Sequence, residues 1–188
     1  QIEKTYTSFV NPKRKIPHFI QDLTHIKEED VKHAQPFEAI AHEVYDMLQD
    51  CVFVAHNIDF DLPFLQEEFK RCGLPKWFCK SMDTVELSKI LYPTAYSYKL
   101  SEIALELNIG LENAHRADDD AMATARLLKK CFEQLMSLPL ETIQHLHTRS
   151  FKLKSGLAHL FFEALQIKRT KSSQLQHHFL YRGVPILQ

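Results

Sequence analysis

A run of five apolar residues at positions 51–55, Cys-Val-Phe-Val-Ala, constrains the fold more than any other segment. The run is too short for a helix and is typical of a strand that is covered on both faces. A helix opened by Pro36 precedes it and a second amphipathic helix follows, which indicates an α/β fold. The predicted inward positions are Phe37, Ile40, Ala41, Val44 and Leu48 in the first helix, and Leu62, Leu65, Phe69 and Cys72 in the second.

Further segments complete the expected secondary structure. Residues 2–10 are rich in Thr, Tyr, Phe and Val and predict a strand that ends at Asn11-Pro12. Residues 80–84 predict a short edge strand, followed by helices at 85–91 and 101–107. The best-defined helix comes after His115, with Asp118 as its cap. Its predicted buried positions are Ala121, Ala125, Leu128, Phe132 and Leu135.

The composition is that of one globular domain with an appendage, because the 188 residues are 45% hydrophobic and 25% charged. Residues 1–135 hold 16 Lys and Arg against 22 Asp and Glu, whereas residues 136–188 hold 7 against 2. The acidic body argues against a broad phosphate-neutralising surface, so nucleic acid would have to enter a local site. No apolar run approaches the ~18 residues of a membrane span and no export signal is present, so we expect a cytoplasmic protein without membrane contact.

The segment after the apolar run carries two aspartates where the chain turns from strand to helix. His56-Asn57 must make the turn, and Pro63 fits only in a first helical turn, so we expect the helix to begin near Phe60. Asp59 and Asp61 then lie at the carboxyl end of a buried strand, where open α/β sheets bind ligands. The alternative is that both only cap the helix, and the spacing does not choose between the two aspartates.

A second acidic segment places His115 five residues before Asp120. Five residues at ~100° each leave them about 140° apart on a helix, so His115 must reach a site from the preceding loop. The alternative is that Asp118, Asp119 and Asp120 only satisfy the helix N-terminus. Together the two segments supply carboxylates for divalent cations and a base for the attacking water, which phosphodiester hydrolysis needs. Asp83 also precedes a predicted helix, and there we favour a cap over a catalytic role.

The pattern A-H-N-x-x-F-D ending at Asp61 and the pattern H-R-A-x-x-D-A around Asp120 resemble the second and third motifs of DnaQ-like, DEDD-type 3′-to-5′ exonucleases that use histidine. The resemblance covers about residues 1–135 and implies an RNase H-like mixed sheet flanked by helices. It implies that Asp61 and Asp120 are catalytic metal ligands for two divalent cations, Mg²⁺ or Mn²⁺, and that His115 is the general base. It also implies substrate contacts at His56, Asn57, Phe60 and Arg116, with Phe60 as a packing residue.

Segments around Pro36, Asp61 and Asp83 are similar to the exonuclease domain fused to DinG-type helicases of Gram-positive bacteria. This resemblance implies an exonuclease domain at 1–135 and a helical linker or extension at 136–188 toward a helicase region. The implied substrate is the 3′ end of single-stranded DNA or RNA. The alternative for the tail is one helix that packs on the body, with residues 168–171 as a solvated basic run. Its inward positions would be Leu157, Leu160, Phe161 and Leu165.

The sequence departs from that family in two places. The first motif, Asp-x-Glu on a leading strand, does not precede Ile2, which leaves two carboxylates where four are expected. The missing Met and the abrupt strand start favour truncation over natural loss, so we expect first strands to be missing and the chain to be incomplete for catalysis. His25 stands where the family commonly has glycine, which predicts a positive φ there.

Two other functions remain open from these residues. One is a non-catalytic module that binds nucleic acid or a partner through a degenerate exonuclease fold. The other is a structural domain attached to a motor, in which the acidic residues are only helix caps. Loss of the leading strand would expose a sheet edge in either case.

Overall fold

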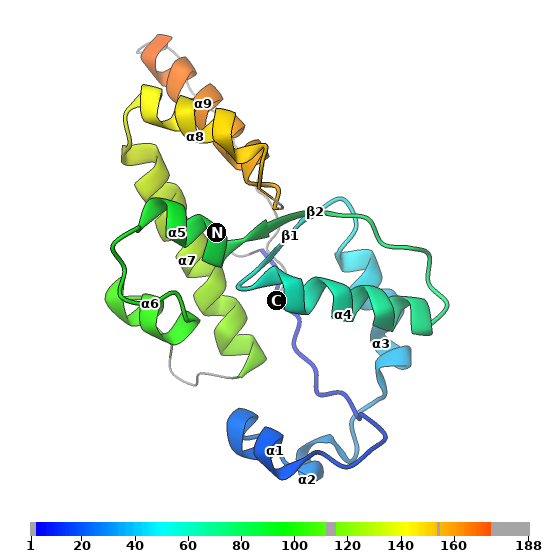
Figure 1. Ribbon diagram of the computed structural model, residues 1–188. Coiled ribbons are helices and arrows are strands. Elements are labelled where there is room, and N and C mark those ends of the chain that lie inside the picture. Colours follow the sequence, from blue (N-terminus) through cyan, green and yellow to red (C-terminus); the bar gives the residue numbers. More distant parts are fainter. Residues whose placement is uncertain (1–2, 112–115, 154, 174–188) are drawn as a thin grey trace.

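The computed structural model describes residues 3–111, 116–153 and 155–173 (Figure 1). These residues form two strands and helices on both sides of them, which confirms the α/β fold with a sheet flanked by helices. No helix within these ranges is both long enough and apolar enough to cross a membrane. The elements are α1 (His18–Thr24), α2 (Glu28–Val31), α3 (Phe37–Met47), β1 (Val52–Ala55), α4 (Ile58–Arg71), β2 (Lys80–Asp83), α5 (Thr84–Leu91), α6 (Leu100–Glu106), α7 (Ala117–Ser137), α8 (Leu140–Ser150) and α9 (Leu157–Ser173).

The apolar run forms β1, which pairs in parallel with β2 so that Val52 lies opposite Lys80 and Ala55 opposite Asp83. Successive side chains of β1 enter two different hydrophobic clusters, because alternate residues of a strand point to opposite faces. Val54 belongs to the larger cluster, and Phe53 and Ala55 belong to the smaller one. The predicted strand that is covered on both faces is therefore confirmed.

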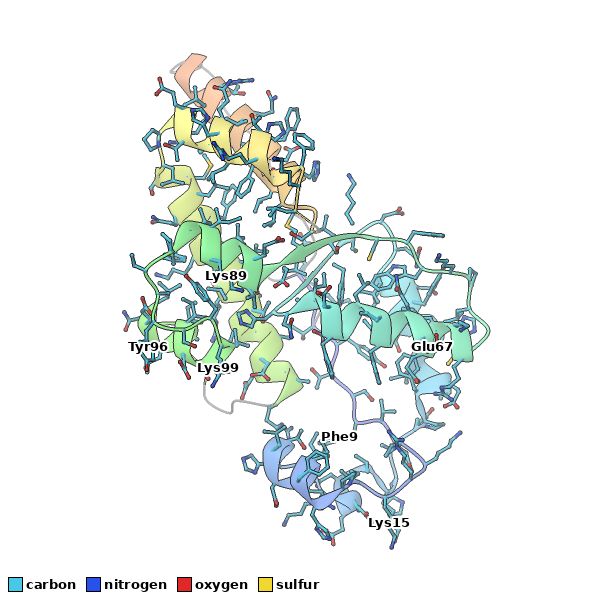
Figure 2. The ribbon with its side chains drawn as sticks, viewed as in Figure 1. Phe9, Lys15, Glu67, Lys89, Tyr96 and Lys99 are labelled. Atoms are coloured by element: carbon cyan, nitrogen blue, oxygen red, sulfur yellow. The ribbon has the colours of Figure 1, made fainter. Side chains whose placement is uncertain are left out.

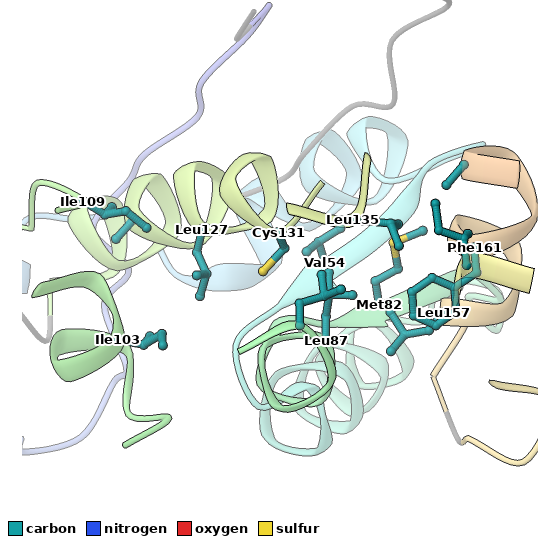
Figure 3. Close-up of a cluster of buried hydrophobic side chains, with 14 of the residues drawn as sticks. Val54, Met82, Leu87, Ile103, Ile109, Leu127, Cys131, Leu135, Leu157 and Phe161 are labelled. Atoms are coloured by element: carbon teal, nitrogen blue, oxygen red, sulfur yellow. The ribbon is translucent and has the colours of Figure 1, made fainter. Parts of the chain in front are cut away.

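The larger cluster joins elements that lie far apart in the sequence. Figure 3 shows Val54 and Met82 of the two strands together with Leu87 of α5, and with Leu157 and Phe161 of α9. Leu87, Leu157 and Phe161 have no exposed surface. The α8–α9 hairpin therefore shares one core with the strands, as expected for a tail helix that packs on the body.

A close backbone contact fixes this hairpin to β2. The Gly156 N–H donates to the Ser81 carbonyl oxygen at 2.6 Å, and the Ser155 hydroxyl donates to the Glu86 carboxylate. A Cβ at position 156 would lie 2.7 Å from the Ser81 oxygen, which no ordinary contact allows. Glycine is required here for close approach, in the way that it is at other crowded backbone contacts.

Two sequence predictions of secondary structure are wrong in detail. Residues 3–10 form no strand: in the described ranges the sheet consists of β1 and β2, and this segment pairs with neither of them. Helix α4 begins at Ile58 and not near Phe60, so Pro63 lies in its second turn. Proline has no N–H, and one helical hydrogen bond is missing there.

The register of α7 differs in part from the prediction, although Ala125 and Leu135 are buried as expected. Its fully buried positions include Leu127 and Cys131, whereas Leu128 and Phe132 are only partly buried. The buried stripe is rotated because α5, α6 and β1 all pack against this helix. The cap prediction for Asp118 is wrong as well, since Arg116 is the N-cap residue and Asp118 lies in the first turn.

Candidate active site

His56 follows β1 and holds three segments of the chain together. Its Nδ1 lies 2.9 Å from Thr84 Oγ1, and its Nε2 lies 2.8 Å from the Tyr98 carbonyl oxygen. Burial lowers the pKa of His56, which favours the neutral ring. Since a carbonyl oxygen only accepts, we assign the proton to Nε2, and the Thr84 hydroxyl then donates to Nδ1. Both nitrogens have protein partners, so the ring positions this corner of the fold, and its predicted substrate contact stays a prediction.

The turn after His56 is closed by one carboxylate. Asn57 has a left-handed backbone (φ 77°) and is the N-cap residue of α4. Asp83 accepts hydrogen bonds from the backbone N–H groups of Asn57 (3.1 Å), Ile58 (3.3 Å) and Val85 (2.8 Å). One side chain thus caps α4 and α5 together, which confirms the predicted capping role of Asp83 and explains the early start of α4.

Removing this shared cap should destabilise the protein more than removing an ordinary one. We expect Asp83→Ala to cost about 2 kcal/mol, because three N–H donors lose their acceptor. For a chain of this size that lowers Tm by about 4–8 °C, measured by thermal unfolding. Asp83→Asn, which keeps one acceptor oxygen, should lose less; equal losses for the two variants would show that the cap is not the source of the stability.

A cleft of about 580 Å³ opens at the carboxyl end of β1. Its lining includes Asp61 of α4 and Asp120 of α7, together with three other residues predicted for the site, His56, Asn57 and Phe60. Leu23 and Thr24, at the end of α1, line it as well. The next residue, His25, has φ 57°, which confirms the positive φ predicted there.

The predicted site residue Arg116 is not part of this lining. Arg116 is the N-cap residue of α7, its Nε lies 3.7 Å from Asp118 Oδ1, and its guanidinium lies 5.6 Å from the ring centroid of Phe9. Phe9 is labelled in Figure 2. His115 lies outside the described residues. The structure therefore brings together two carboxylates, a turn and an aromatic ring from segments that are distant in sequence.

The cleft is electrostatically negative. Burial, and then the charge of Asp83, raise the pKa of Asp61, and the charge of Asp120 also acts on His56. Among the described residues that line it there is no Lys or Arg. Carboxylate oxygens are the ligands that Mg²⁺ and Mn²⁺ prefer, so the donor chemistry fits a divalent cation. In the described ranges, however, no group of three or more His, Cys, Asp or Glu side chains is placed to hold one.

Phe60 does not pack in the core, and that prediction is wrong. Its side chain is 73% exposed, because α4 buries the opposite face, which carries Ile58 and Phe69. Phe64, one turn further along, is 63% exposed and lines the same cleft. Phe64 was not among the predicted site residues, although two phenylalanines four residues apart and outside the apolar stripe indicate an exposed aromatic face.

Comparison with known proteins places the chain among nucleases. Residues 1–128 match the family model described as "Exonuclease". The chain is 46% identical over 166 residues to the "3′-5′ exonuclease DinG" of Staphylococcus aureus strains USA300 and NCTC 8325, which covers 88% of this chain and 18% of each relative. The chain thus spans about a fifth of the length of these relatives.

A solved structure supports the fold. It is "Exonuclease X in complex with 5′ overhanging duplex DNA", with a TM-score of 0.51 and 24% sequence identity. The match covers 66% of this chain and 70% of the other. The similarity confirms the expected RNase H-like arrangement.

Proposed function

Because this chain belongs to the exonuclease family, a DnaQ-like group of nucleic-acid hydrolases, we propose that it removes nucleotides one at a time from the 3′ end of single-stranded DNA or RNA. The observation that carries the proposal is the position of Asp61 and Asp120. They come from two helices, α4 and α7, and line one cleft at the carboxyl end of β1. Capping two separate helices does not require that the two carboxylates line the same cleft.

Asp61 and Asp120 would hold the divalent cations, Mg²⁺ or Mn²⁺, through their carboxylate oxygens. When bound, such a cation supplies positive charge at the scissile phosphate and activates water. Two cations need more ligands than these two carboxylates, and no Asp-x-Glu segment occurs in the sequence. We therefore expect the 188-residue chain to be inactive or slow until further carboxylates are added.

The other proposed roles follow from the family resemblance for His115 and from the observed positions for the described residues. His115 would take the proton from the attacking water, as a general base does. Phe60 and Phe64 are exposed on one face of α4 and would stack on the terminal bases. Arg116 would contact a phosphate, and Asn57 would contact the substrate where the chain turns into α4.

We further propose that residues 1–135 form the exonuclease domain, and that residues 136–188 lead toward a covalently linked helicase region. The similarity to the much longer DinG relatives supports this organisation. The extension would then begin with α8 and α9, which pack on the exonuclease domain through the core shared with β1 and β2.

The test is Mn²⁺-dependent shortening of a 5′-labelled single-stranded oligonucleotide. It compares this chain with the same chain extended at its amino end by a strand pair that carries Asp-x-Glu, about 20–30 residues. We expect a ladder of 3′-shortened products from the extended protein, and its loss when a chelator removes the metal. No ladder from either protein, together with salt-dependent binding of the oligonucleotide, would favour the non-catalytic binding module.

A further inference from the structure

A second pocket, of about 690 Å³, lies between β2 and the α8–α9 hairpin. Lys80, Ser81 and Met82 of β2 line one side of it, and His147 and Phe162 of the hairpin line another. It shares no lining residue with the cleft that holds Asp61 and Asp120. In Figure 1 the hairpin projects from the opposite end of the molecule to α1, whose last residues line that cleft.

Three aromatic rings meet at this pocket. His147 makes an edge contact with Phe151 (centroids 5.0 Å apart) and a tilted contact with Phe162 (5.6 Å). Phe151 is 70% exposed and Phe162 is 42% exposed. Large aromatic side chains left in solvent on one surface indicate a binding face.

The pocket differs in charge from the cleft. Its described lining includes the cation Lys80 and contains no Asp or Glu. The Glu86 carboxylate lies close by, where it accepts a hydrogen bond from Ser155. Burial raises the pKa of the Cys79 thiol, so this lining residue adds no negative charge at neutral pH. Arg149 and Lys152, on either side of Phe151 along the chain, are exposed.

We propose that this pocket is a second binding site for single-stranded nucleic acid, in which a base stacks on the rings of Phe151, Phe162 and His147 and a phosphate contacts Lys80. Aromatic platforms combined with positive charge are the means by which proteins bind single strands without sequence preference. A protein partner is the other occupant of exposed aromatic surface, but a pocket with cationic lining and no carboxylate favours a polyanion.

The inference rests on the proposed nucleic-acid substrate but not on catalysis. A strand held at both sites binds more tightly than at either one, because the second contact becomes intramolecular. The pocket would thus retain the body of a strand while its 3′ end occupies the cleft. Short oligonucleotides, which cannot reach both sites, would gain nothing from it.

The test measures binding of fluorescent oligothymidylates of about 4 and about 30 nucleotides to the 188-residue chain in the presence of Mg²⁺, with which this chain is expected to be inactive or slow. We expect the double variant Phe151→Ala, Phe162→Ala to bind the long strand about tenfold more weakly. Its affinity for the short strand should stay unchanged. Lys80→Gln should reduce the slope of log affinity against log salt by about 1. Tyr96→Ala is the matched control, because Tyr96 is 96% exposed on the α5–α6 connection, away from both sites (Figure 2).

Photocrosslinking of an iodouracil-labelled strand locates the contact, and we expect crosslinks within residues 147–162. Unchanged affinity of the double variant, or crosslinks confined to the cleft, would overturn the proposal. Binding of a protein and not of DNA to the hairpin would overturn it too. The double variant Phe60→Ala, Phe64→Ala tests the cleft separately: if only that variant loses affinity, the second site fails while the proposed function stands. The reverse pattern would remove support for the substrate contacts proposed at the cleft.

Discussion

Asp61→Asn should abolish most of the Mn²⁺-dependent nucleotide release of the amino-terminally extended protein, by about 100-fold or more, without lowering its Tm. Asparagine has nearly the same shape but cannot supply a charged metal ligand. The carboxylate of Asp61 is half-buried beside Asp83, and burial raises its pKa, so its charge is unfavourable for the folded state at neutral pH. Removing that charge should therefore leave the stability equal or slightly higher. Nuclease rates and thermal unfolding of the same preparation check both parts.

Asp59→Asn is the matched control. Asp59 lies in the same first turn of α4, but it is exposed and does not line the cleft. We expect this variant to retain its activity. If Asp61→Asn and Asp59→Asn behaved alike, both aspartates would be helix-terminal charges only, and the proposed metal site would be wrong.

Phe161→Ala should have the largest effect on stability, a loss of about 3–5 kcal/mol, which is typical for truncating a fully buried phenylalanine. Phe161 has no exposed surface and packs in the cluster that also contains Val54 and Leu87. The free energy of unfolding by urea measures the loss. Because the cluster joins α9 to the strands, the whole protein and not only the hairpin should become easier to unfold.

The neighbouring residue provides the comparison for that experiment. Phe162 is 42% exposed, so Phe162→Ala should cost less than about 1 kcal/mol. A loss from Phe161→Ala as small as this would mean that α9 can leave the body without disturbing the strands. In that case α8 and α9 would be an independent unit.

The structure could be predicted from the sequence wherever a local pattern of residues decides it. The apolar run predicted β1, the acidic residue before residues 85–91 predicted the cap Asp83, and the motifs around Asp61 and Asp120 predicted side chains that do share a cleft. A positive φ at a turn of the chain could also be predicted, as at His25. For β1 and Asp83 the residue type itself sets the outcome, whereas the positive φ of His25 and the joint site of Asp61 and Asp120 were implied by the family resemblance.

Features that depend on distant partners could not be predicted in this way. Residues 3–10 have the composition of a strand, but a strand forms only where a second one pairs with it. The rotation of the buried stripe of α7 follows from the helices packed around it, and the attachment of the hairpin follows from the contact between Gly156 and Ser81. No periodicity within α7 or within the tail encodes these contacts.

Asp83, the shared cap, affects how a nucleic-acid strand and a cation can approach the cleft. The positive ends of α4 and α5 are both directed at Asp83, and the first turn of α7 contains Asp118, Asp119 and Asp120. None of these three helix ends is left to attract an anion, although helix N-termini are common phosphate sites in other enzymes. A nucleic-acid strand approaching alone would meet repulsion at the cleft. Under the proposed function, the cation would therefore bind before the strand, and metal concentration, more than strand concentration, would set how often a productive encounter occurs.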